Sequence, residues 1–350
     1  MRTTIRAAVI GCGIISYEHL TYLKSAPGVD LVAVCDTSRA AAAFAASQYS
    51  AEAHYVDMTT MLKAARPDVV HVLTPPSTHF AVVMACLAAE CHVICEKPAA
   101  RTIGELEVML ECAQRHHRRL MESQNLLFND EVISIAKDMA AGALGEVREV
   151  DVMLSLDLAA SRFGDLNLSS PAGDLPGGAV HDFLPHLAYL FLHFSGAPVE
   201  SVSGRLLNAS GNARVGFDHL DALVVAGQVR GRLRVASDLQ PNAFRLIVRG
   251  TRGSRETDLY NSYMRREGGR NIRTRIAIEH LTSGMQLAST AFTNLRNKVL
   301  QHGTYHGLPR LLDSFYTTLR AGLSQPIPVS SMRTSALLID QLVALQAVSS

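Results

Sequence analysis

The first third of the chain alternates between two hydrophobic patterns. Short apolar runs rich in β-branched residues occur at 5–10, 31–35, 69–73 and 92–95. Helical periodicity lies between and after them, at about 14–24, 39–48, 58–64, 78–89 and 103–116, with a further short run near Leu120. Strands that lack a polar face and alternate with helices are typical of a parallel sheet covered on both sides. Because such crossovers are right-handed, the pattern predicts a doubly wound α/β domain.

The pattern changes after about residue 126. Long segments that alternate apolar and polar residues follow at 147–156, 201–207, 222–229, 233–239 and 244–250, and Gly-Gln-Val-Arg-Gly at 227–231 resembles a hairpin connection. Helices are expected at about 130–141, 182–194, 308–321 and 333–347. Consecutive strands without intervening helices predict a largely antiparallel sheet. We therefore expect two domains, an α/β domain over 1–123 and an α+β domain over 124–350.

Composition and charge narrow the function classes. A hydrophobic fraction of 48% and a net charge of +1 are ordinary for a globular protein and favour neither nucleic acid nor an acidic membrane surface. The N-terminus lacks the pattern of a secretory signal. The most apolar stretch, Val69–Leu73, is interrupted by His71 and is too short to span a bilayer. We expect a cytoplasmic protein without a nucleic-acid or membrane partner.

The cysteines support the same compartment. All six lie within the first 112 residues, at Cys12, Cys35, Cys86, Cys91, Cys95 and Cys112, and none forms a C-x-x-C pair. Cysteines at the ends of apolar runs behave as small hydrophobic residues. We interpret all six as reduced and structural, which fits a reducing compartment, and we expect no metal site.

A glycine turn follows the first predicted strand. The sequence Gly11-Cys12-Gly13-Ile14-Ile15-Ser16 has the form G-x-G-x-x-S between a strand and a helix. In a Rossmann domain the first glycine permits the tight turn, and the second allows a pyrophosphate to approach the helix N-terminus. Ser16 replaces the usual third glycine or alanine but is still small. Because G-x-G alone is more often a simple turn, a nucleotide site needs a second signal.

Asp36 supplies that signal, 20 residues after Ser16 at the end of the second strand. A carboxylate there accepts hydrogen bonds from both adenine-ribose hydroxyls and repels a 2′-phosphate, so it favours NAD over NADP. Arg39 leaves NADP open, because a guanidinium can bind a 2′-phosphate or lie on the adenine face. The alternative interpretation is that Asp36 caps the following helix.

Two further strand ends carry candidate residues. The third strand ends in Thr74-Pro75-Pro76-Ser77-Thr78-His79, and the fourth ends in Glu96-Lys97-Pro98. Ligands of open α/β sheets bind beyond the carboxyl ends of the strands, so the first segment is expected to wall the nicotinamide and Lys97 to reach a substrate oxygen. The alternatives are a helix entry capped by Thr78 and an ordinary lysine at a strand end.

The partner motif of Lys97 lies in the second domain, at Gly177–His186. If a helix begins near Asp182, then Asp182 and His186 stand at i and i+4 on one face, with Pro185 in the first turn. A carboxylate that fixes the tautomer of an imidazole makes an acid–base pair. The alternative is a helix cap with a core histidine, which we prefer for His181 and His193.

Taken in order, these motifs resemble the Gfo/Idh/MocA family, which includes glucose–fructose oxidoreductase and inositol dehydrogenase. The resemblance covers residues 1–125 and 177–194, includes His19, and depends most on Glu96-Lys97-Pro98 with the Asp182 and His186 motif. It implies a Rossmann domain followed by an α/β domain whose sheet often mediates oligomers, here a homodimer or homotetramer. It also implies that Lys97, Asp182 and His186 are catalytic and that Asn125 lies near the active site. Relatives often have an arginine soon after that asparagine, whereas Leu126-Leu127-Phe128 follows here.

The resulting hypothesis is an NAD(P)-dependent oxidoreductase that acts on a secondary alcohol or ketone of a sugar, cyclitol or nucleotide sugar. The substrate is expected to contact Lys97, Asn125, Asp182 and His186. The cofactor is expected to contact Gly11, Gly13, Ile14, Ile15, Asp36, Thr37, Arg39, Thr74, Pro75, Pro76, His79, Glu96 and Lys97. The basic stretch Arg265–Arg275 suits either a nucleotide-sugar diphosphate or a solvated surface loop, and we favour the loop. Two other functions stay open: an enzyme that recycles a tightly bound NAD during elimination or hydrolysis, and a non-catalytic NAD(P)-sensing regulator.

Overall fold

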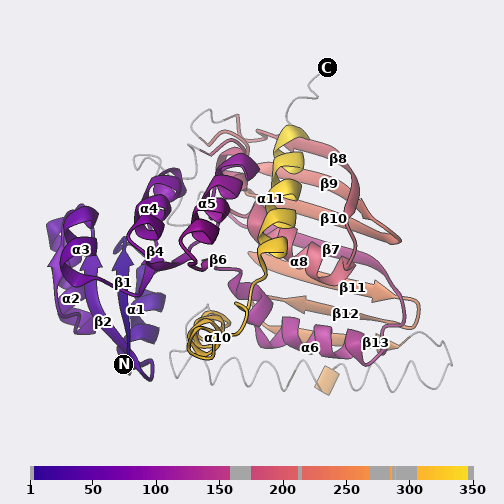
Figure 1. Ribbon diagram of the computed structural model, residues 1–350. Helices are drawn as coiled ribbons and strands as arrows, with labels where there is room; N and C mark the ends of the chain where they lie inside the picture. The colour runs from indigo at the N-terminus through magenta and orange to yellow at the C-terminus, as the bar shows by residue number, and fades with distance from the viewer. Residues whose placement is uncertain are drawn as a thin grey trace. The chain divides into compact units, whose positions relative to one another are not determined.

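The computed structural model describes residues 4–157, 175–211, 215–268, 284–285, 288 and 306–345. The chain divides into two compact units (Figure 1). The first unit comprises Met1–Asn125 and Gly307–Ala336, and the second comprises Leu126–His306 and Leu337–Ser350. Compactness thus groups 307–336 with the first unit, although these residues follow the second one along the chain.

The first unit is built on a parallel sheet of six strands. Its strands are β1 (Ile5–Ile10), β2 (Val29–Cys35), β3 (His54–Tyr55), β4 (Val69–Val72), β5 (His92–Cys95) and β6 (Leu120–Glu122), in the order β3-β2-β1-β4-β5-β6. Every residue of β4 and β6 is buried, as expected for strands covered on both faces. The order reverses between β1 and β4, which confirms the predicted doubly wound sheet.

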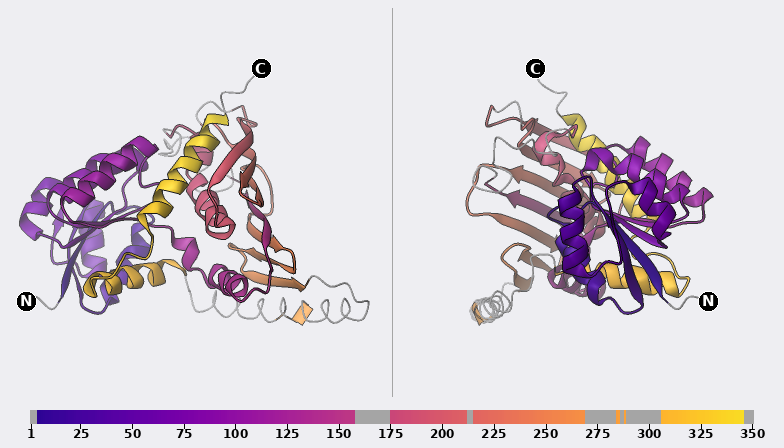
Figure 2. Two further views of the ribbon diagram at one scale, coloured as in Figure 1. Left: turned by 45° about the vertical axis from the view of Figure 1, so that its right-hand side comes forward. Right: turned by 90° about the vertical axis from the view of Figure 1, so that its left-hand side faces the viewer.

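Helices cover both faces of this sheet. They are α1 (Ser16–Ser25), α2 (Arg39–Tyr49), α3 (Met58–Ala65), α4 (Pro76–Ala88), α5 (Ile103–Arg115) and α10 (Leu308–Arg320). Helices α4 and α5 lie on one face, and α1 and α10 lie side by side on the other (Figures 1 and 2). The late segment is fixed to this unit by polar contacts, since Arg119 donates to Thr318 at 3.2 Å and Arg333 binds Glu107 at 2.8 Å.

The second unit contains a mixed sheet of seven strands. Its strands are β7 (Val147–Ser155), β8 (Val199–Leu207), β9 (His219–Ala226), β10 (Val229–Ala236), β11 (Ala243–Gly250), β12 (Gly253–Asp258) and β13 (Tyr263–Gly268). The order is β13-β12-β11-β7-β10-β9-β8, and the β7–β10 pair is parallel whereas the other described pairs of this sheet are antiparallel. Burial alternates strictly along most of β9 and β10, so one face of the sheet carries the core.

Helices pack on that buried face. The second unit contains the 3₁₀ helix η1 (Asn125–Phe128, of which Asn125 belongs to the first unit) and the α-helices α6 (Asp130–Ala140), α7 (Gly178–His181), α8 (Leu184–Ser195) and the end of α11 (Val329–Ala344). Helix α8 packs against β7 and β10 and is buried over most of its length. Gly231 on β10 permits this close packing, because an added Cβ would collide with the ring of Phe191.

Several elements differ from the sequence prediction. The hairpin turn consists of Gly227 and Gln228 alone, because Val229 already pairs with Ala226 in the ladder. Strands β12 and β13 were not predicted, since GSRETD and YMRREG lack an alternating apolar pattern. Helix α8 begins at Leu184 rather than near Asp182, which lies between α7 and α8.

Candidate active site

The glycine turn has the geometry that a dinucleotide requires. Gly11 has φ +97°, and an added Cβ would lie 2.7 Å from the carbonyl carbon and oxygen of Leu73. Only glycine therefore fits at this position without moving the backbone. Gly13 is different, because a Cβ added there would meet no atom within 4 Å among the described residues. The two glycines thus serve separate needs, a tight turn and open space beside the turn.

The N-terminus of α1 faces the same open space. Ile15 is its N-cap residue and makes no side-chain cap. No hydrogen bond reaches the amides of Ile14 and Ile15 within the described part of the chain. Free amide donors and the positive end of a helix dipole are the features that bind a phosphate. Ser16 keeps close packing, as its hydroxyl donates to the Gly13 carbonyl at 2.6 Å. These residues fit a dinucleotide pyrophosphate.

Asp36 connects the turn to the second strand. Its carboxylate accepts from the Cys12 amide at 2.8 Å and from the Ser38 amide at 2.8 Å. The cap of α2 is Ser38, whose hydroxyl accepts from the Ala41 amide, so the interpretation of Asp36 as the helix cap is wrong. A carboxylate has about four acceptor positions, so two remain for ribose hydroxyls. Thr37 and Arg39 are exposed beside it.

The segment after β4 is an entry to α4. The helix begins at Pro76 with Pro75 as N-cap, and Thr78 lies inside the first turn rather than at the cap. His79 is fully buried, and its two ring nitrogens lie 2.8 Å from the Pro98 carbonyl oxygen and 2.7 Å from that of Thr74. Burial lowers the pKa of His79, although both carbonyls oppose this effect. His79 therefore connects the ends of β4 and β5.

Lys97 and Glu96 follow the end of β5. Lys97 is half-buried, while Glu96 is buried and accepts a hydrogen bond from His19 Nε2 at 3.2 Å. Burial alone would raise the pKa of Glu96, but the hydrogen bond from His19 and the charge of Lys97 hold it below its usual value. Glu122 at the end of β6 behaves oppositely, since burial raises its pKa. The pKa values of these two buried carboxyl groups are thus shifted in opposite directions.

Asn125 ends the first unit. Its side chain is buried, and its Oδ1 has no hydrogen-bond partner among the described residues. An unpaired buried carbonyl oxygen is costly and marks a place where a donor group is missing. The predicted asparagine therefore carries a buried acceptor atom that no described donor satisfies.

The predicted pair Asp182 and His186 lies in the second unit. Asp182 follows α7, whereas His186 is buried in the first turn of α8. His186 Nδ1 lies 2.6 Å from the hydroxyl of Tyr189, which also accepts from the Leu126 amide at 3.4 Å. Sequence reasoning missed Tyr189, although it stands three residues after His186 on a helix. The proposed contact of Asp182 with His186 stays a prediction.

The sequence analysis also considered His181, His193 and the six cysteines, and their surroundings suit structural residues. His181 is buried beside the backbone of Gly177, and burial lowers the pKa of His193. All six cysteines are free, and burial raises the pKa of Cys12 to about 12 and that of Cys35 to about 11. Within the described ranges, no three His, Cys, Asp or Glu residues are grouped to hold a metal ion. Nor is any described helix long and apolar enough to cross a membrane.

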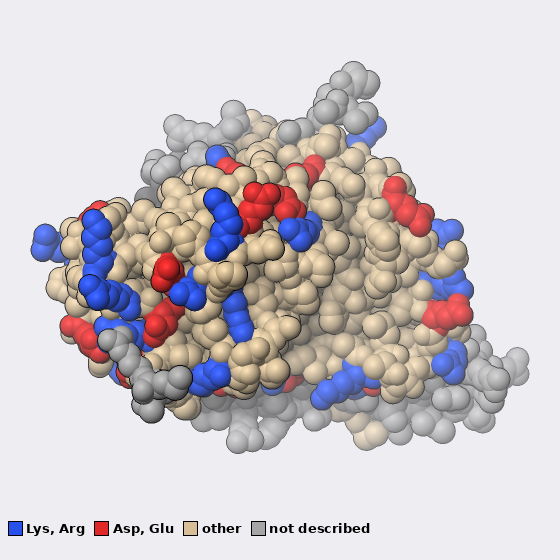
Figure 3. All heavy atoms as spheres, viewed as in Figure 1, with Lys and Arg blue, Asp and Glu red and all other residues tan. Residues whose placement is uncertain are grey.

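The basic stretch is divided by the structure. Arg265 and Arg266 belong to β13, while 269–275 lie outside the described residues. Arg265 contacts Glu267 at 2.6 Å, and Arg266 contacts Asp138 at 3.3 Å. Both arginines thus form ion pairs within the second unit. On the face shown in Figure 3, basic and acidic side chains are interspersed, in keeping with the net charge of +1.

Comparison with protein-family models decides the family. Residues 5–124 match the model described as "Oxidoreductase family, NAD-binding Rossmann fold", and residues 133–256 match the model of the GFO/IDH/MocA C-terminal domain. The chain belongs to the Gfo/Idh/MocA family. The first unit is therefore its NAD-binding domain, and the predicted cofactor class is confirmed.

Individual relatives match only part of the chain. D-glucoside 3-dehydrogenase of Escherichia coli is 32% identical over 41% of this chain and 41% of its own length. Inositol 2-dehydrogenase of Salmonella typhimurium is 32% identical over 34% of this chain and 36% of its own length. The chain thus matches about two fifths or less of these relatives. Among solved structures, the WlbA dehydrogenase of Bordetella pertussis in complex with NADH and UDP-GlcNAcA superimposes with a TM-score of 0.80 at 19% identity, covering 98% of this chain and 96% of that one. At that identity the likeness concerns the fold.

Proposed function

We propose that this protein is an NAD-dependent dehydrogenase that interconverts a secondary alcohol and a ketone on a sugar, cyclitol or nucleotide sugar. The main support for the proposal is that the glycine turn, whose geometry suits a dinucleotide, and Lys97 both follow carboxyl ends of strands in the same sheet. Membership of an oxidoreductase family supports it. The names of the relatives, which are dehydrogenases of a glucoside and of inositol, support the substrate class.

The cofactor is proposed to bind along the carboxyl edge of the parallel sheet. The amides of Ile14 and Ile15 receive the pyrophosphate, and Asp36 receives the adenine ribose. Thr74, Pro75 and Pro76 wall the nicotinamide side, and Arg39 lies near the adenine. His79 and Glu96 act indirectly, because both side chains bind protein groups around Lys97. Asp36 favours NAD, since a 2′-phosphate beside its carboxylate would be repelled.

The chemistry needs a base, a charge partner and an orienting group. Bound nicotinamide supplies the hydride acceptor or donor. We propose that His186 accepts the hydroxyl proton, that Lys97 stabilises the developing alkoxide, and that Asp182 favours the charged form of the imidazole. Tyr189 holds the ring through Nδ1. Asn125 Oδ1 is proposed to accept a second substrate hydroxyl, which would satisfy its unpaired oxygen. Assembly as a homodimer or homotetramer and a cytoplasmic location complete the proposal.

The test is the absorbance of reduced nicotinamide on mixing the protein with NAD or NADP and a panel of sugars, cyclitols and nucleotide sugars. Lys97→Ala is expected to lower turnover by about 10²–10⁴-fold with little change in NAD affinity. Lys63→Ala, at an exposed lysine on α3, is the matched control and should match the wild type. Loss of NAD binding with intact turnover per bound cofactor would overturn the role of Lys97. No change in nicotinamide absorbance with any substrate of the panel, together with NAD retained by the purified protein, would instead favour an enzyme that recycles its cofactor.

A further inference from the structure

Three buried side chains extend from Glu96 into the first unit. His19 on α1 binds Glu96 through Nε2 at 3.2 Å and lies 2.8 Å from His71 through Nδ1. His71 on β4 lies 2.9 Å from the hydroxyl of Tyr316 on α10 through its own Nε2. The side chains of His19, His71 and Tyr316 are fully buried. Four side chains from four elements thus form one continuous hydrogen-bonded chain, which we call the Glu96 chain.

With His19 neutral, the donors and acceptors of this chain run in one direction. An ionised Glu96 only accepts, so His19 carries its proton on Nε2 and accepts at Nδ1. His71 must then carry its proton on Nδ1 and accept at Nε2, where the Tyr316 hydroxyl donates. Every buried polar atom in the series is satisfied with both histidines neutral. Burial lowers the pKa of His71 well below its usual value, which agrees with a neutral His71 ring.

Several titratable groups surround Glu96 in the first unit. The titratable groups that interact electrostatically with Glu96 are His19 on α1, His79 on α4, Cys95 on β5, Glu122 on β6 and the neighbouring Lys97, while His71 on β4 contacts His19. Glu96 already balances Lys97.

The far end of the chain does not reach solvent. Tyr316 is fully buried and stacks on Tyr22, with ring centroids 6.1 Å apart and planes at 22°. Burial raises the pKa of Tyr316 well above its usual value, so the phenol stays a donor. A chain that ends on a buried, protonated phenol is unsuited to exchange protons with water. Its effect is to orient its own side chains and to hold the negative charge of Glu96.

We propose that His19, His71 and Tyr316 are positioning residues for Lys97: as a directed chain of neutral donors they keep Glu96 ionised, and that charge holds Lys97 in its charged form. The inference deepens the proposed function and rests on the catalytic role assigned to Lys97. A carboxylate without its imidazole donor in a buried site takes up a proton, and the lysine beside it then loses its proton at lower pH.

The first experiment needs no turnover. Long-range ¹H–¹⁵N spectra of the full-length protein at neutral pH are expected to show His19 as the Nε2–H tautomer and His71 as the less common Nδ1–H tautomer. Carboxyl ¹³C shifts of labelled glutamate should show an ionised Glu96. A charged His19 with its proton shared toward His71, or an Nε2–H form of His71, would overturn the direction of the chain. A failure of the proposed dehydrogenase activity leaves this measurement intact.

The second experiment measures pH profiles of turnover in conservative variants. Tyr316→Phe removes the terminal donor, and His19→Gln removes the imidazole that contacts Glu96. The alkaline limb of the profile is expected to move to lower pH by about one unit in His19→Gln and by less in Tyr316→Phe, with KM for NAD unchanged. Turnover at a pH one unit above the wild-type limb would then fall about tenfold further than the wild type does.

The matched control is Tyr22→Phe, which removes a phenol hydroxyl from the ring that stacks on Tyr316 but lies outside the chain. It should keep the wild-type profile. If folded His19→Gln and Tyr316→Phe both keep the wild-type profile and an ionised Glu96, the chain is structural and the proposal is wrong. A shifted ¹³C signal of Glu96 in Tyr316→Phe supports it even where His19→Gln fails to fold.

Discussion

The backbone amide of Cys12 donates to the carboxylate of Asp36 across 2.8 Å, so the residue proposed to bind the adenine ribose also braces the glycine turn. Asp36 receives the Ser38 amide as well, which orders the entry to α2. One carboxylate therefore connects the first strand–helix turn to the second. A change at Asp36 is therefore expected to act on the turn and on the proposed ribose site together.

For this reason, Asp36→Ala is expected to weaken NAD binding by about tenfold or more, since hydrogen bonds to a charged acceptor contribute about 1.5–3 kcal/mol each. Affinity for NADP should fall less, because the repulsion of the 2′-phosphate disappears with the carboxylate. Isothermal titration with both cofactors measures the two effects. Equal losses for NAD and NADP would show that Asp36 acts through the turn alone.

The two turn glycines give a matched pair of variants. Gly11→Ala places a Cβ 2.7 Å from the backbone of Leu73 and forces alanine to φ +97°, so it should lower the free energy of unfolding by several kcal/mol. Gly13→Ala meets no protein atom within 4 Å and should leave stability within about 0.5 kcal/mol of the wild type.

NAD binding should nevertheless be lost in Gly13→Ala, because its methyl group occupies the space through which a pyrophosphate approaches. Urea denaturation and NAD titration of both variants separate the two roles. A Gly13→Ala protein that is stable and binds NAD normally would contradict the dinucleotide turn.

The sequence was sufficient to predict those parts of the fold that a local pattern of residues determines. Uniformly apolar runs such as 92–95 and the glycine spacing at Gly11 and Gly13 depend on near neighbours in the chain, so the parallel sheet and its turn were predictable. The mixed sheet was predicted only where burial alternates. Strands β12 and β13 are held by ladder pairing and by contacts such as Arg255 with Asp138 at 2.6 Å, which leave no apolar pattern.

The Glu96 chain was unpredictable for a different reason. His71 and Tyr316 are 245 residues apart, and neither belongs to a motif. Only the fold of the first unit, including its late helix α10, brings them together. The helix start at Leu184 was also missed by two residues, because the short α7 takes up 178–181 and separates Asp182 from the helix that carries His186.

Tyr189→Phe tests the surroundings of His186. The variant keeps the ring but removes the hydroxyl that lies 2.6 Å from Nδ1, so the imidazole loses a partner that fixes its orientation and tautomer. Turnover is expected to fall about tenfold, which corresponds to about 1.4 kcal/mol, and the pH profile should change. Tyr263→Phe, which loses a hydrogen bond to Glu256 on β12, is the control and should not change turnover. Unchanged turnover and pH profile in Tyr189→Phe would remove Tyr189 from the site.

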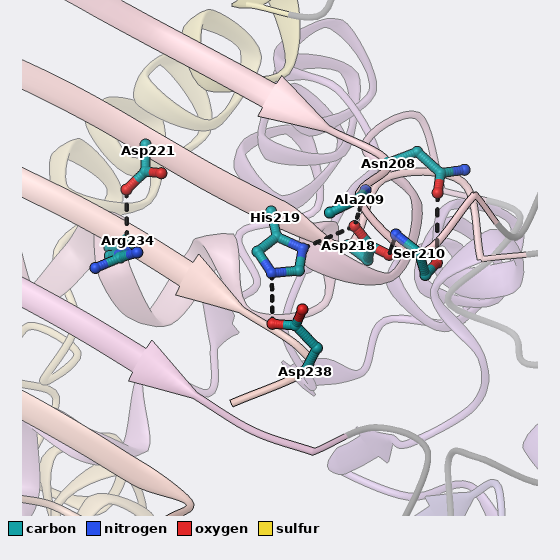
Figure 4. Close-up of polar contacts among 8 residues, drawn as sticks. All are labelled: Asn208, Ala209, Ser210, Asp218, His219, Asp221, Arg234 and Asp238. Atoms are coloured by element: carbon teal, nitrogen blue, oxygen red, sulfur yellow. Dashed lines mark hydrogen bonds and ion pairs between the residues drawn. The ribbon is translucent and has the colours of Figure 1, made fainter. Parts of the chain in front are cut away.

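His219 on β9 lies between two carboxylates (Figure 4). Its Nδ1 contacts Asp218 at 2.8 Å and its Nε2 contacts Asp238 at 2.7 Å. Burial opposes a charge on this ring, but the two carboxylates outweigh it and raise the pKa of His219. Burial likewise opposes an ionised Asp218, yet the hydrogen bonds from Ser210, His219 and Ala209 lower its pKa. The charged imidazole thus connects the loop after β8 to the loop after β10.

The sign of the resulting pH dependence follows from both shifts. A raised pKa in the folded protein stabilises it below the ordinary value of histidine, about 6.5, and this contribution disappears as the pH rises through the raised value. A lowered pKa at Asp218 stabilises the protein above the ordinary value of aspartate, about 3.9, and is lost as the pH falls through the lowered value. The contact should therefore be strongest between about pH 4 and 6.5.

His219→Gln is expected to lower the free energy of unfolding by about 1–2 kcal/mol at pH 5.5 and by less at pH 9, because the contribution of the charged imidazole is lost as the pH rises through its raised pKa. Urea denaturation of the second-unit sheet in the full-length protein, at both pH values, provides the measurement. Asp221→Asn is the control, because its ion pair with Arg234 on the same strands is exposed and contributes little at either pH (Figure 4). A loss of equal size at pH 5.5 and pH 9 would mean that His219 stabilises the sheet through packing and neutral hydrogen bonds, and that its charge has no part in it.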